Sequence, residues 1–343
     1  GSEMCIRDSS IGMARSHIPS SYNHQWQKAM AWVRNNTEKN SVFAHWWDYG
    51  YWIQTIGERA TVLDGGNFII YWNHLMGRHV LTGKSEKEAL EFLYSHNATH
   101  LLIDSTDIGK YPAYSSIGSD VNYDRYSYLP VFLLDERQTI ETKDGMIKIY
   151  RGGFALDEDL IYKKDKEIFY PAGRAVIAAV KMDLEKIRNN EGQPEIIIFY
   201  QNRQEAIPLR YIYMDGKLYD FKKGYAGGLY LMPSIQQSSS GVNIKEFGAG
   251  IFLSERTIKS NLVRLYLFNF GENFKLVHSQ DNLIIEDLKK QGAKINDIAL
   301  FQGNILGPIK IWRINYPPGI EHKKEYLDLD YPNPEVAYAG PIY

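Results

Sequence analysis

The sequence contains a single cysteine among 343 residues, and that residue, Cys5, lies in the opening segment GSEMCIRDSS. One cysteine excludes disulfide bridges within the chain and metal sites built from several thiolates. The segment begins with Gly-Ser, as the remnant of a cleaved tag does, and shows no hydrophobic periodicity. We therefore assign residues 1–21 to a tag and linker and base the fold prediction on the rest.

Charge of one sign and long hydrophobic runs are also lacking. The 39 Lys and Arg side chains face 41 Asp and Glu side chains, which gives a formal net charge of -2. Without a basic excess or a block of like charges, nucleic acid is not an expected partner. No apolar run approaches the roughly 20 residues that span a bilayer, so we expect this chain as given to be soluble. What is abundant is aromatic: 25 Tyr, 14 Phe and 7 Trp favour β-structure and amphipathic contact surfaces.

The first part of the chain alternates helical and strand patterns. Trp26, Met30 and Val33 recur at helical spacing, and SVFAH and RATVL read as short strands. A capping box, Ser85 with Glu88 three residues later, begins a helix that leads into the strand HLLID. This order predicts an α/β lobe with functional groups at the carboxyl ends of its strands, where WWDYG and the residues after HLLID fall.

The middle of the chain has a different pattern. TIETKDGMIKIY and YIYMDGKLYDF each place Asp-Gly between alternating runs, which predicts β-hairpins. Helical spacing returns in SERTIKSNLVRLYLF, followed by the strand-like FKLVHS and IKIWRINY. We therefore predict a mixed α/β core lobe that is discontinuous because a β-rich insertion interrupts it. The predicted divisions are 22–135 for the first part of the core, 136–247 for the insertion, 248–316 for the second part of the core and 317–343 for a C-terminal tail.

Several other features carry weaker functional signals. The histidines at positions 45, 74, 79, 96 and 100 show no convincing metal-ligand spacing, so we expect surface histidines and no metal bound by this chain. The Tyr-rich stretch from Tyr211 to Tyr230 could bind sugar by ring stacking, but alternating Tyr on hairpins is more often sheet packing.

The pentapeptide Trp46-Trp47-Asp48-Tyr49-Gly50 is the most specific signal, because a given sequence with two tryptophans arises by chance in on the order of one chain in ten thousand or fewer. It resembles the signature of the catalytic subunit of oligosaccharyltransferase, most closely the archaeal form, AglB. That family carries a D-x-x-K arrangement after a βαβ segment, and here Asp107-Ile108-Gly109-Lys110 follows HLLIDST. The family pattern has Met or Ile four positions after the Lys, where this chain has Tyr114, with Pro112 between. The middle β-rich segment matches no motif and looks like the insertion of some archaeal members.

The resemblance implies transfer of an oligosaccharide from a dolichol phosphate-type lipid carrier to Asn in Asn-X-Ser/Thr. In the implied pocket for the acceptor hydroxyl, Asp48 accepts a hydrogen bond and the indole N–H groups of Trp46 and Trp47 donate. The stem of Lys110 belongs to the apolar wall, which favours Thr over Ser by roughly 1 kcal/mol through one methyl group. We assign Tyr49, Gly50 and Asp107 supporting roles.

The chemistry of the reaction also calls for catalytic groups that the resemblance places in a region outside this sequence. Activation of an amide nitrogen and departure of a lipid phosphate need carboxylates and a divalent cation. In the family these lie in an N-terminal transmembrane region with Mn²⁺ or Mg²⁺. We therefore expect an extracytoplasmic domain of an archaeal membrane enzyme, with no catalytic residue in this fragment and no activity alone. Its expected partners are acceptor polypeptides, lipid-linked oligosaccharide and its own transmembrane region. The alternative is an aromatic-rich, cell-surface carbohydrate-binding module without a transferase role.

Overall fold

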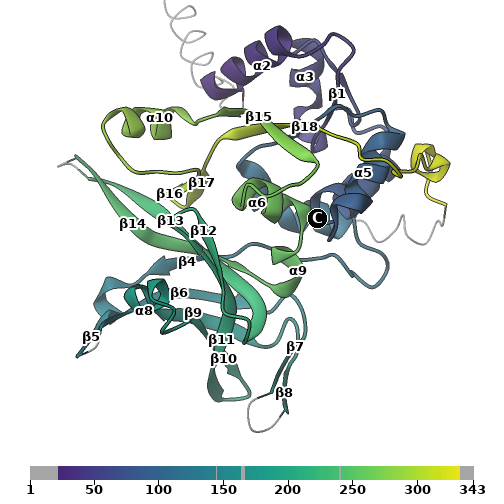
Figure 1. Cartoon of the computed structure of the whole chain (residues 1–343). Coiled ribbons are helices and arrows are strands. Elements are labelled where there is room, and N and C mark those ends of the chain that lie inside the picture. Colours follow the sequence, from purple (N-terminus) through teal and green to yellow (C-terminus); the bar gives the residue numbers. More distant parts are fainter. Residues whose placement is uncertain (1–21, 144, 164–166, 239–240, 333–343) are drawn as a thin grey trace, which may run out of the picture.

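The computed structural model describes residues 22–143, 145–163, 167–238 and 241–332. Residues 1–21, with Cys5, and the end of the predicted tail, residues 333–343, lie outside this range. Two sheets dominate the described chain, a smaller one surrounded by helices and a larger one that forms most of the β-rich part (Figure 1). The predicted mixed α/β fold is confirmed.

The smaller sheet has five strands in the order β15-β18-β3-β1-β2. Its strands are β1 Val42–Ala44, β2 Ala60–Thr61, β3 His100–Ile103, β15 Phe274–Gln280 and β18 Ile309–Ile314. β1 pairs in parallel with both β2 and β3, as expected where helices connect consecutive strands. β18 pairs antiparallel with β3 and with β15. Strands more than 170 residues apart along the chain thus share one sheet, and the prediction of a discontinuous core is confirmed.

Helices cover this sheet, and side chains cap the first turns of α2 and α5. Asn23 caps the first helix by accepting from the backbone N–H of Trp26, and Ser85 accepts from that of Glu88, as the capping box predicted. The helices of this part are α2 His24–Asn36, α3 Gly50–Thr55, α4 Ile70–Leu75, α5 Glu86–Ser95, α6 Thr106–Gly109, α7 Tyr111–Ile117, α9 Glu255–Ile258 and α10 Leu283–Lys290. The helix predicted around Leu262 is broken, since α9 is followed by a separate π-helical turn, η4 Val263–Leu267. A second π-helical turn, η2 Met76–Leu81, extends α4.

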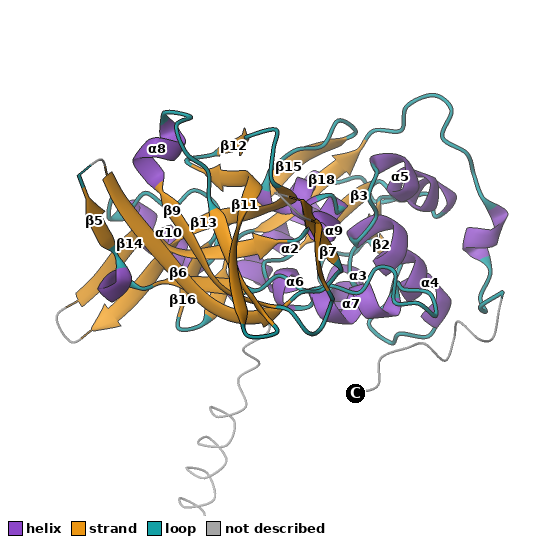
Figure 2. Ribbon diagram, turned by 90° about the horizontal axis from the view of Figure 1, so that it is seen from below, coloured by secondary structure: helices purple, strands orange, loops and turns teal. Residues whose placement is uncertain are grey.

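The larger sheet has eleven strands and closes on itself, because β11 pairs with β10 and β12 and also, in parallel, with β13 (Figure 2). Its strands are β4 Val131–Leu134, β5 Ile140–Thr142, β6 Gly145–Ala155, β9 Val176–Asp183, β10 Glu195–Tyr200, β11 Arg203–Met214, β12 Lys217–Asp220, β13 Tyr225–Ser238, β14 Gly241–Leu253, β16 Ala299–Phe301 and β17 Asn304–Leu306. A separate hairpin pairs β7 Leu160–Lys163 with β8 Glu167–Tyr170, and the helix α8 Leu184–Arg188 follows β9. Short 3-10 turns lie at Glu136–Gln138 and Lys324–Leu327.

Both predicted Asp-Gly hairpins are present. Met214 pairs with Lys217 across a two-residue loop in which Asp215 and Gly216 both have positive φ, the geometry for which Asp-Gly is favoured. β5 and β6 pair up to Thr142 and Gly145, while Asp144 itself lies outside the described residues.

The two sheets share one hydrophobic core. Tyr230, Met232 and Ile251 of the larger sheet pack in the same cluster as Leu262 and Leu102 of the helical part. A second cluster, which includes Ile198 and Leu209, fills the inside of the closed sheet. The predicted boundaries at 135/136 and 247/248 remain predictions: β4, before the first boundary, pairs with β14 and β6, and β14 runs across the second. No helix in the described part of the chain has the length and apolar character needed to cross a bilayer.

Candidate functional site

The WWDYG residues follow the first strand of the smaller sheet. Trp46 is extended, and Trp47–Tyr49 form a 3-10 turn, η1, that runs directly into α3. The segment lies at the carboxyl end of its strand and is a tight turn continuous with a helix. Asp48 and Tyr49 are therefore held by backbone geometry at the carboxyl end of β1.

Position 50 has no room for a side chain, so glycine is required there. A Cβ atom on Gly50 would lie 2.4 Å from the backbone nitrogen of Gly65 and within 2.8 Å of backbone atoms of Asp64. Its own φ of -53° is helical, so backbone conformation does not demand glycine. The last residue of the pentapeptide thus lets α3 rest directly on the loop that contains Asp64 and Gly65.

The Tyr49 hydroxyl joins the two sequence motifs. It donates to Asp107 Oδ1 at 2.8 Å and accepts from Lys110 Nζ at 3.0 Å. Since its one hydrogen goes to Asp107, the Thr106 hydroxyl at 2.9 Å acts as a second donor. The expected supporting role of Tyr49 therefore has a physical basis: one buried hydroxyl holds both members of the D-x-x-K segment against the pentapeptide.

Lys110 and Asp48 form an ion pair at the rim of this network. The distance from Lys110 Nζ to Asp48 Oδ2 is 2.5 Å, and each side chain is 29% exposed. Lys110 Nζ also lies 4.6 Å from the centroid of the Tyr49 ring and 4.0 Å from Asp107 Oδ1. The ammonium group thus faces two carboxylates and the face of an aromatic ring, while the Asp48 carboxylate remains half-open to solvent.

Asp107 is buried, and its carboxylate organises the turn after β3. Oδ2 accepts from the backbone N–H of Asp104 at 3.0 Å, and Oδ1 accepts from Tyr49. Burial raises the pKa of Asp107 to about 7, although the charge of Lys110 acts in the opposite direction. Burial also raises the pKa of Asp104, whose Oδ1 accepts from the backbone N–H of Thr106.

The D-x-x-K segment is divided into two short helices at Lys110. Lys110 lies between α6 and α7, and Pro112 occupies the first turn of α7, where its missing N–H costs nothing. Tyr114, at the position where the family pattern has Met or Ile, donates its hydroxyl to the backbone carbonyl of Asp107 at 2.9 Å. The departure from the pattern therefore adds a hydrogen bond that ties α7 to Asp107.

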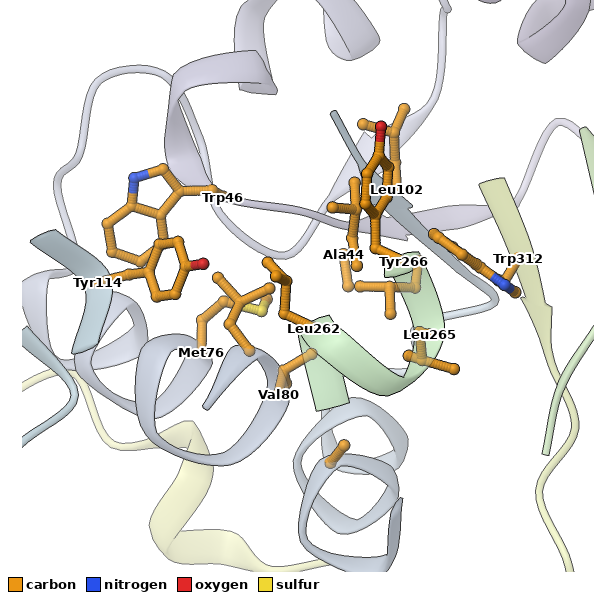
Figure 3. Packing of buried hydrophobic residues seen from close by; sticks show 14 of the residues in the cluster. Ala44, Trp46, Met76, Val80, Leu102, Tyr114, Leu262, Leu265, Tyr266 and Trp312 are labelled. Atoms are coloured by element: carbon orange, nitrogen blue, oxygen red, sulfur yellow. The ribbon is translucent and has the colours of Figure 1, made fainter. Parts of the chain in front are cut away.

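Trp46 and Trp47 present two free hydrogen-bond donors. The Trp46 ring is buried at the edge of the core with its centroid 5.6 Å from that of Tyr114 (Figure 3), and Trp47 is half-buried. Among the described residues, neither indole N–H has a hydrogen-bond partner. Neither ring nitrogen is among the fully buried unpaired atoms, so both are accessible to solvent. The site therefore places two unoccupied donors in sequence next to a carboxylate acceptor.

The prediction of surface histidines was wrong for His45, His74 and His100, while His79 and His96 are half-buried. His45, His74 and His100 are buried, and burial lowers the pKa of His45 and of His100 to about 4. These side chains pack in the core, as shown by the His100 ring stacked on Phe43 at 4.8 Å. Within the described ranges, no three His, Cys, Asp or Glu side chains come together as metal ligands.

Sequence reasoning missed three contributors to the site. Thr106 donates to Tyr49, Tyr114 supports both Trp46 and Asp107, and the Asp64–Gly65 loop receives Gly50. The Gly-Gly pair in LDGGN was the available signal for a close backbone approach. Nothing local in the sequence indicated the contacts of Tyr114, because its partners are set by how α7 packs.

Comparisons with known proteins point to one group. No family model matches the chain. A dolichyl-phosphooligosaccharide-protein glycotransferase 1 of Pyrococcus horikoshii is 46% identical over 44 residues, which are 12% of this chain and 4% of that protein. A glycotransferase 2 of Pyrococcus furiosus is 20% identical over 290 residues, or 82% of this chain and 30% of that protein.

Among solved structures, the oligosaccharyltransferase of Archaeoglobus fulgidus tethered with an acceptor peptide containing the NVT sequon is 12% identical. The match covers 85% of this chain and 33% of that one, with a TM-score of 0.44. This chain spans less than a third of the length of each curated relative cited above. The sequence matches nevertheless agree with the resemblance carried by Trp46–Gly50: this chain is similar in sequence to dolichyl-phosphooligosaccharide-protein glycotransferases.

Proposed function

We propose that this chain is the acceptor-recognition domain of an oligosaccharyltransferase and binds the Ser or Thr of Asn-X-Ser/Thr. The observation that carries the proposal is the Asp48–Lys110 ion pair, held by the Tyr49 hydroxyl and directly preceded in the sequence by Trp46 and Trp47, whose indole N–H groups have no hydrogen-bond partner among the described residues. The relatives at the sequence level are named dolichyl-phosphooligosaccharide-protein glycotransferases, which supports this class of reaction.

A hydroxyl group matches this arrangement because it both donates and accepts hydrogen bonds. The acceptor hydroxyl donates to the Asp48 carboxylate, whose Oδ2 is paired with Lys110 and whose other oxygen remains available. The indole N–H groups of Trp46 and Trp47 donate to the hydroxyl oxygen. Lys110 is held by the Tyr49 hydroxyl, so it keeps its position beside Asp48 when the peptide binds.

Rejection of other residues follows from the same groups. An Ala or Val in place of Ser or Thr would cover the carboxylate and the indole N–H groups without bonding them, at a cost of about 1–3 kcal/mol for each unpaired group. A pocket built from polar groups therefore discriminates far better than an apolar one. The additional methyl group of Thr contributes roughly 1 kcal/mol over Ser by packing on the stem of Lys110.

We place the bond-making groups outside this chain. The carboxylates near the pocket, Asp48 and Asp107, are both engaged with Lys110, and Asp107 is additionally bonded to Tyr49. The Mn²⁺ or Mg²⁺ and the base that the reaction needs would come from the enzyme's transmembrane region at the extracytoplasmic face. This chain alone is then inactive: incubation with lipid-linked oligosaccharide and an acceptor peptide should give no glycopeptide, and turnover would contradict this part.

Calorimetry with two peptides that differ only as Asn-Ala-Thr and Asn-Ala-Val tests recognition directly. We expect the Thr peptide to bind at least about tenfold more tightly, because one unpaired buried polar group costs 1.4 kcal/mol or more. Trp47→Phe keeps the ring and removes the N–H, so it should narrow the difference between the peptides. Equal affinity for both peptides in the unsubstituted protein would overturn the proposal.

A further inference from the structure

A groove lies at the junction of the β-rich sheet and the helical segment that returns to the smaller sheet. It has a volume of about 550 Å³, within the range of roughly 300–1,000 Å³ typical of small-molecule sites. The lining consists of Lys84, Tyr211, Tyr213, Gly216, Leu218, Ile258, Lys259, Arg264, Phe268 and Phe270. None of these residues belongs to the site built around Tyr49 and Lys110.

Aromatic rings form much of the groove wall. The centroid of the Tyr213 ring lies 4.8 Å from that of Tyr230, its neighbour across the β11–β13 pair, and 5.2 Å from that of Phe268. All three rings are nearly parallel. The Tyr-rich stretch thus packs within the sheet across the parallel β11–β13 pair on one side and forms the groove wall on the other. Phe270 is 51% exposed and Leu218 is 41% exposed, so the wall presents apolar surface to solvent. Flat apolar surfaces of this kind pack against the C–H face of a sugar ring.

The same groove is positively charged. Lys84, Lys259 and Arg264 contribute to the lining, and no Asp or Glu does. In the described part of the chain, the Arg264 guanidinium donates no hydrogen bond, and its carboxylate neighbour Glu86 is 3.7 Å away. Glu86 already accepts three hydrogen bonds from Glu272 and Asn273. The Arg264 guanidinium lies over one face of the Phe270 ring, 5.1 Å from its centroid, which leaves its in-plane N–H donors free for a carboxylate or sulfate.

A second hollow of opposite character adjoins the first. It has a volume of about 240 Å³ and shares Tyr213 and Gly216 with the groove. Its polar lining includes Asp215, Glu246, Lys294, Asn296 and Asp297. Asp215 is paired with Arg188 and Asp297 with Lys310, and their remaining lone pairs accept hydrogen bonds from sugar hydroxyls.

We propose that these two hollows together bind an acidic saccharide. A hexuronate or sulfated sugar packs on Phe268 and Phe270 with its anionic group against Arg264 and Lys84. The hydroxyls of the neighbouring sugar donate to the carboxylates beyond Tyr213. This site goes beyond acceptor recognition and does not depend on it, since the two sites share no residue.

Titration of the full chain with saccharides, followed by saturation-transfer NMR and calorimetry, tests the proposal. The probes are a panel of disaccharides with a terminal glucuronate or a sulfated hexose, the matching neutral disaccharides and an acidic peptide of equal charge. We expect binding of an acidic disaccharide that is at least about tenfold tighter than that of its neutral match and that weakens as salt is added. Absence of binding by every acidic sugar, or equal binding of the neutral sugars, would overturn the proposal. Tighter binding of the acidic peptide would also overturn it, because the site would then be a general anion site.

Variants separate this site from a non-specific charge effect. Arg264→Gln and Lys84→Gln should each weaken binding of the acidic sugar by about tenfold, because each removes a charge-assisted hydrogen bond. Lys275→Gln is the matched control, since Lys275 is exposed on β15 and lines neither hollow. Equal effects of all three changes would contradict a defined site. The response to the Asn-Ala-Thr peptide should be unchanged in Arg264→Gln, which distinguishes failure of this proposal from failure of acceptor recognition.

Discussion

Replacing Gly50 by alanine should destabilise the protein even though alanine is the better helix former. The added Cβ would meet only backbone atoms, at 2.4 Å from Gly65 nitrogen and at 2.7 and 2.8 Å from the carbonyl carbon and Cα of Asp64. Backbone cannot rotate away as a side chain can, so we expect a cost near the upper end of the usual 1–3 kcal/mol for overpacking. The gain in helix propensity offsets up to about 1 kcal/mol. The net loss in the free energy of unfolding is about 2 kcal/mol.

Gly109 provides the matched control within the D-x-x-K segment. A Cβ on Gly109 would meet no atom within 4 Å, and its φ is not positive, so Gly109→Ala should be neutral or stabilising by up to about 1 kcal/mol. Urea unfolding followed by tryptophan fluorescence measures both variants, with the change read from the midpoint at an unchanged slope. Equal midpoints for Gly50→Ala and the unsubstituted protein, or an equal loss in both variants, would refute the close-approach argument.

Three further predictions concern the network behind the motif. Tyr49→Phe removes the donor to Asp107 and the acceptor for Lys110, so we expect a loss of about 1–3 kcal/mol in urea unfolding; an unchanged midpoint would show that water replaces the hydroxyl. The pKa of Asp107 in the folded protein is raised to about 7, so ionisation of this carboxyl destabilises the folded state. The free energy of unfolding, measured relative to Asp107→Asn, should therefore fall as pH rises from about 4 to 7. The expected fall is roughly 1.4 kcal/mol per unit of pKa shift. The buried histidines have lowered pKa values, so their contribution to the free energy of unfolding is fully present above pH 6.5 and is lost as pH falls toward 4. An NMR titration in which His45 protonates near pH 6.5 would contradict this.

Local rules predicted the elements of the fold. The sequence predicted three features: the Ser85 capping box, the Asp215-Gly216 hairpin, and the return of the chain to the smaller sheet after the β-rich segment. Each of them depends on residues a few positions apart or on the periodicity of hydrophobic residues. Burial of His45 and His100 was not predictable from the sequence, since it depends on β1 and β3 lying side by side in a sheet assembled from both ends of the chain.

The site was predictable in its residues and not in its connections. The pentapeptide and D-x-x-K motif identified Asp48 and Lys110 as candidates, but the 2.5 Å ion pair between them depends on η1 and α6 meeting beside Tyr49. Pro112 accounts for the division at Lys110, but the hydrogen bond from Tyr114 to the Asp107 carbonyl spans seven residues and two helices. Long-range contacts of this kind leave no periodic pattern in the sequence.

An NMR titration that follows the indole N–H signals of Trp46 and Trp47 shows directly whether these groups bind the acceptor hydroxyl. Two peptides are added in turn, one with Asn-Ala-Thr and one with Asn-Ala-Val. We expect the Thr peptide to shift both signals and the Val peptide to leave them in place. Asp48→Ala should abolish this difference between the peptides. Equal shifts with both peptides, or shifts with neither, would contradict a hydroxyl pocket built from Trp46, Trp47 and Asp48.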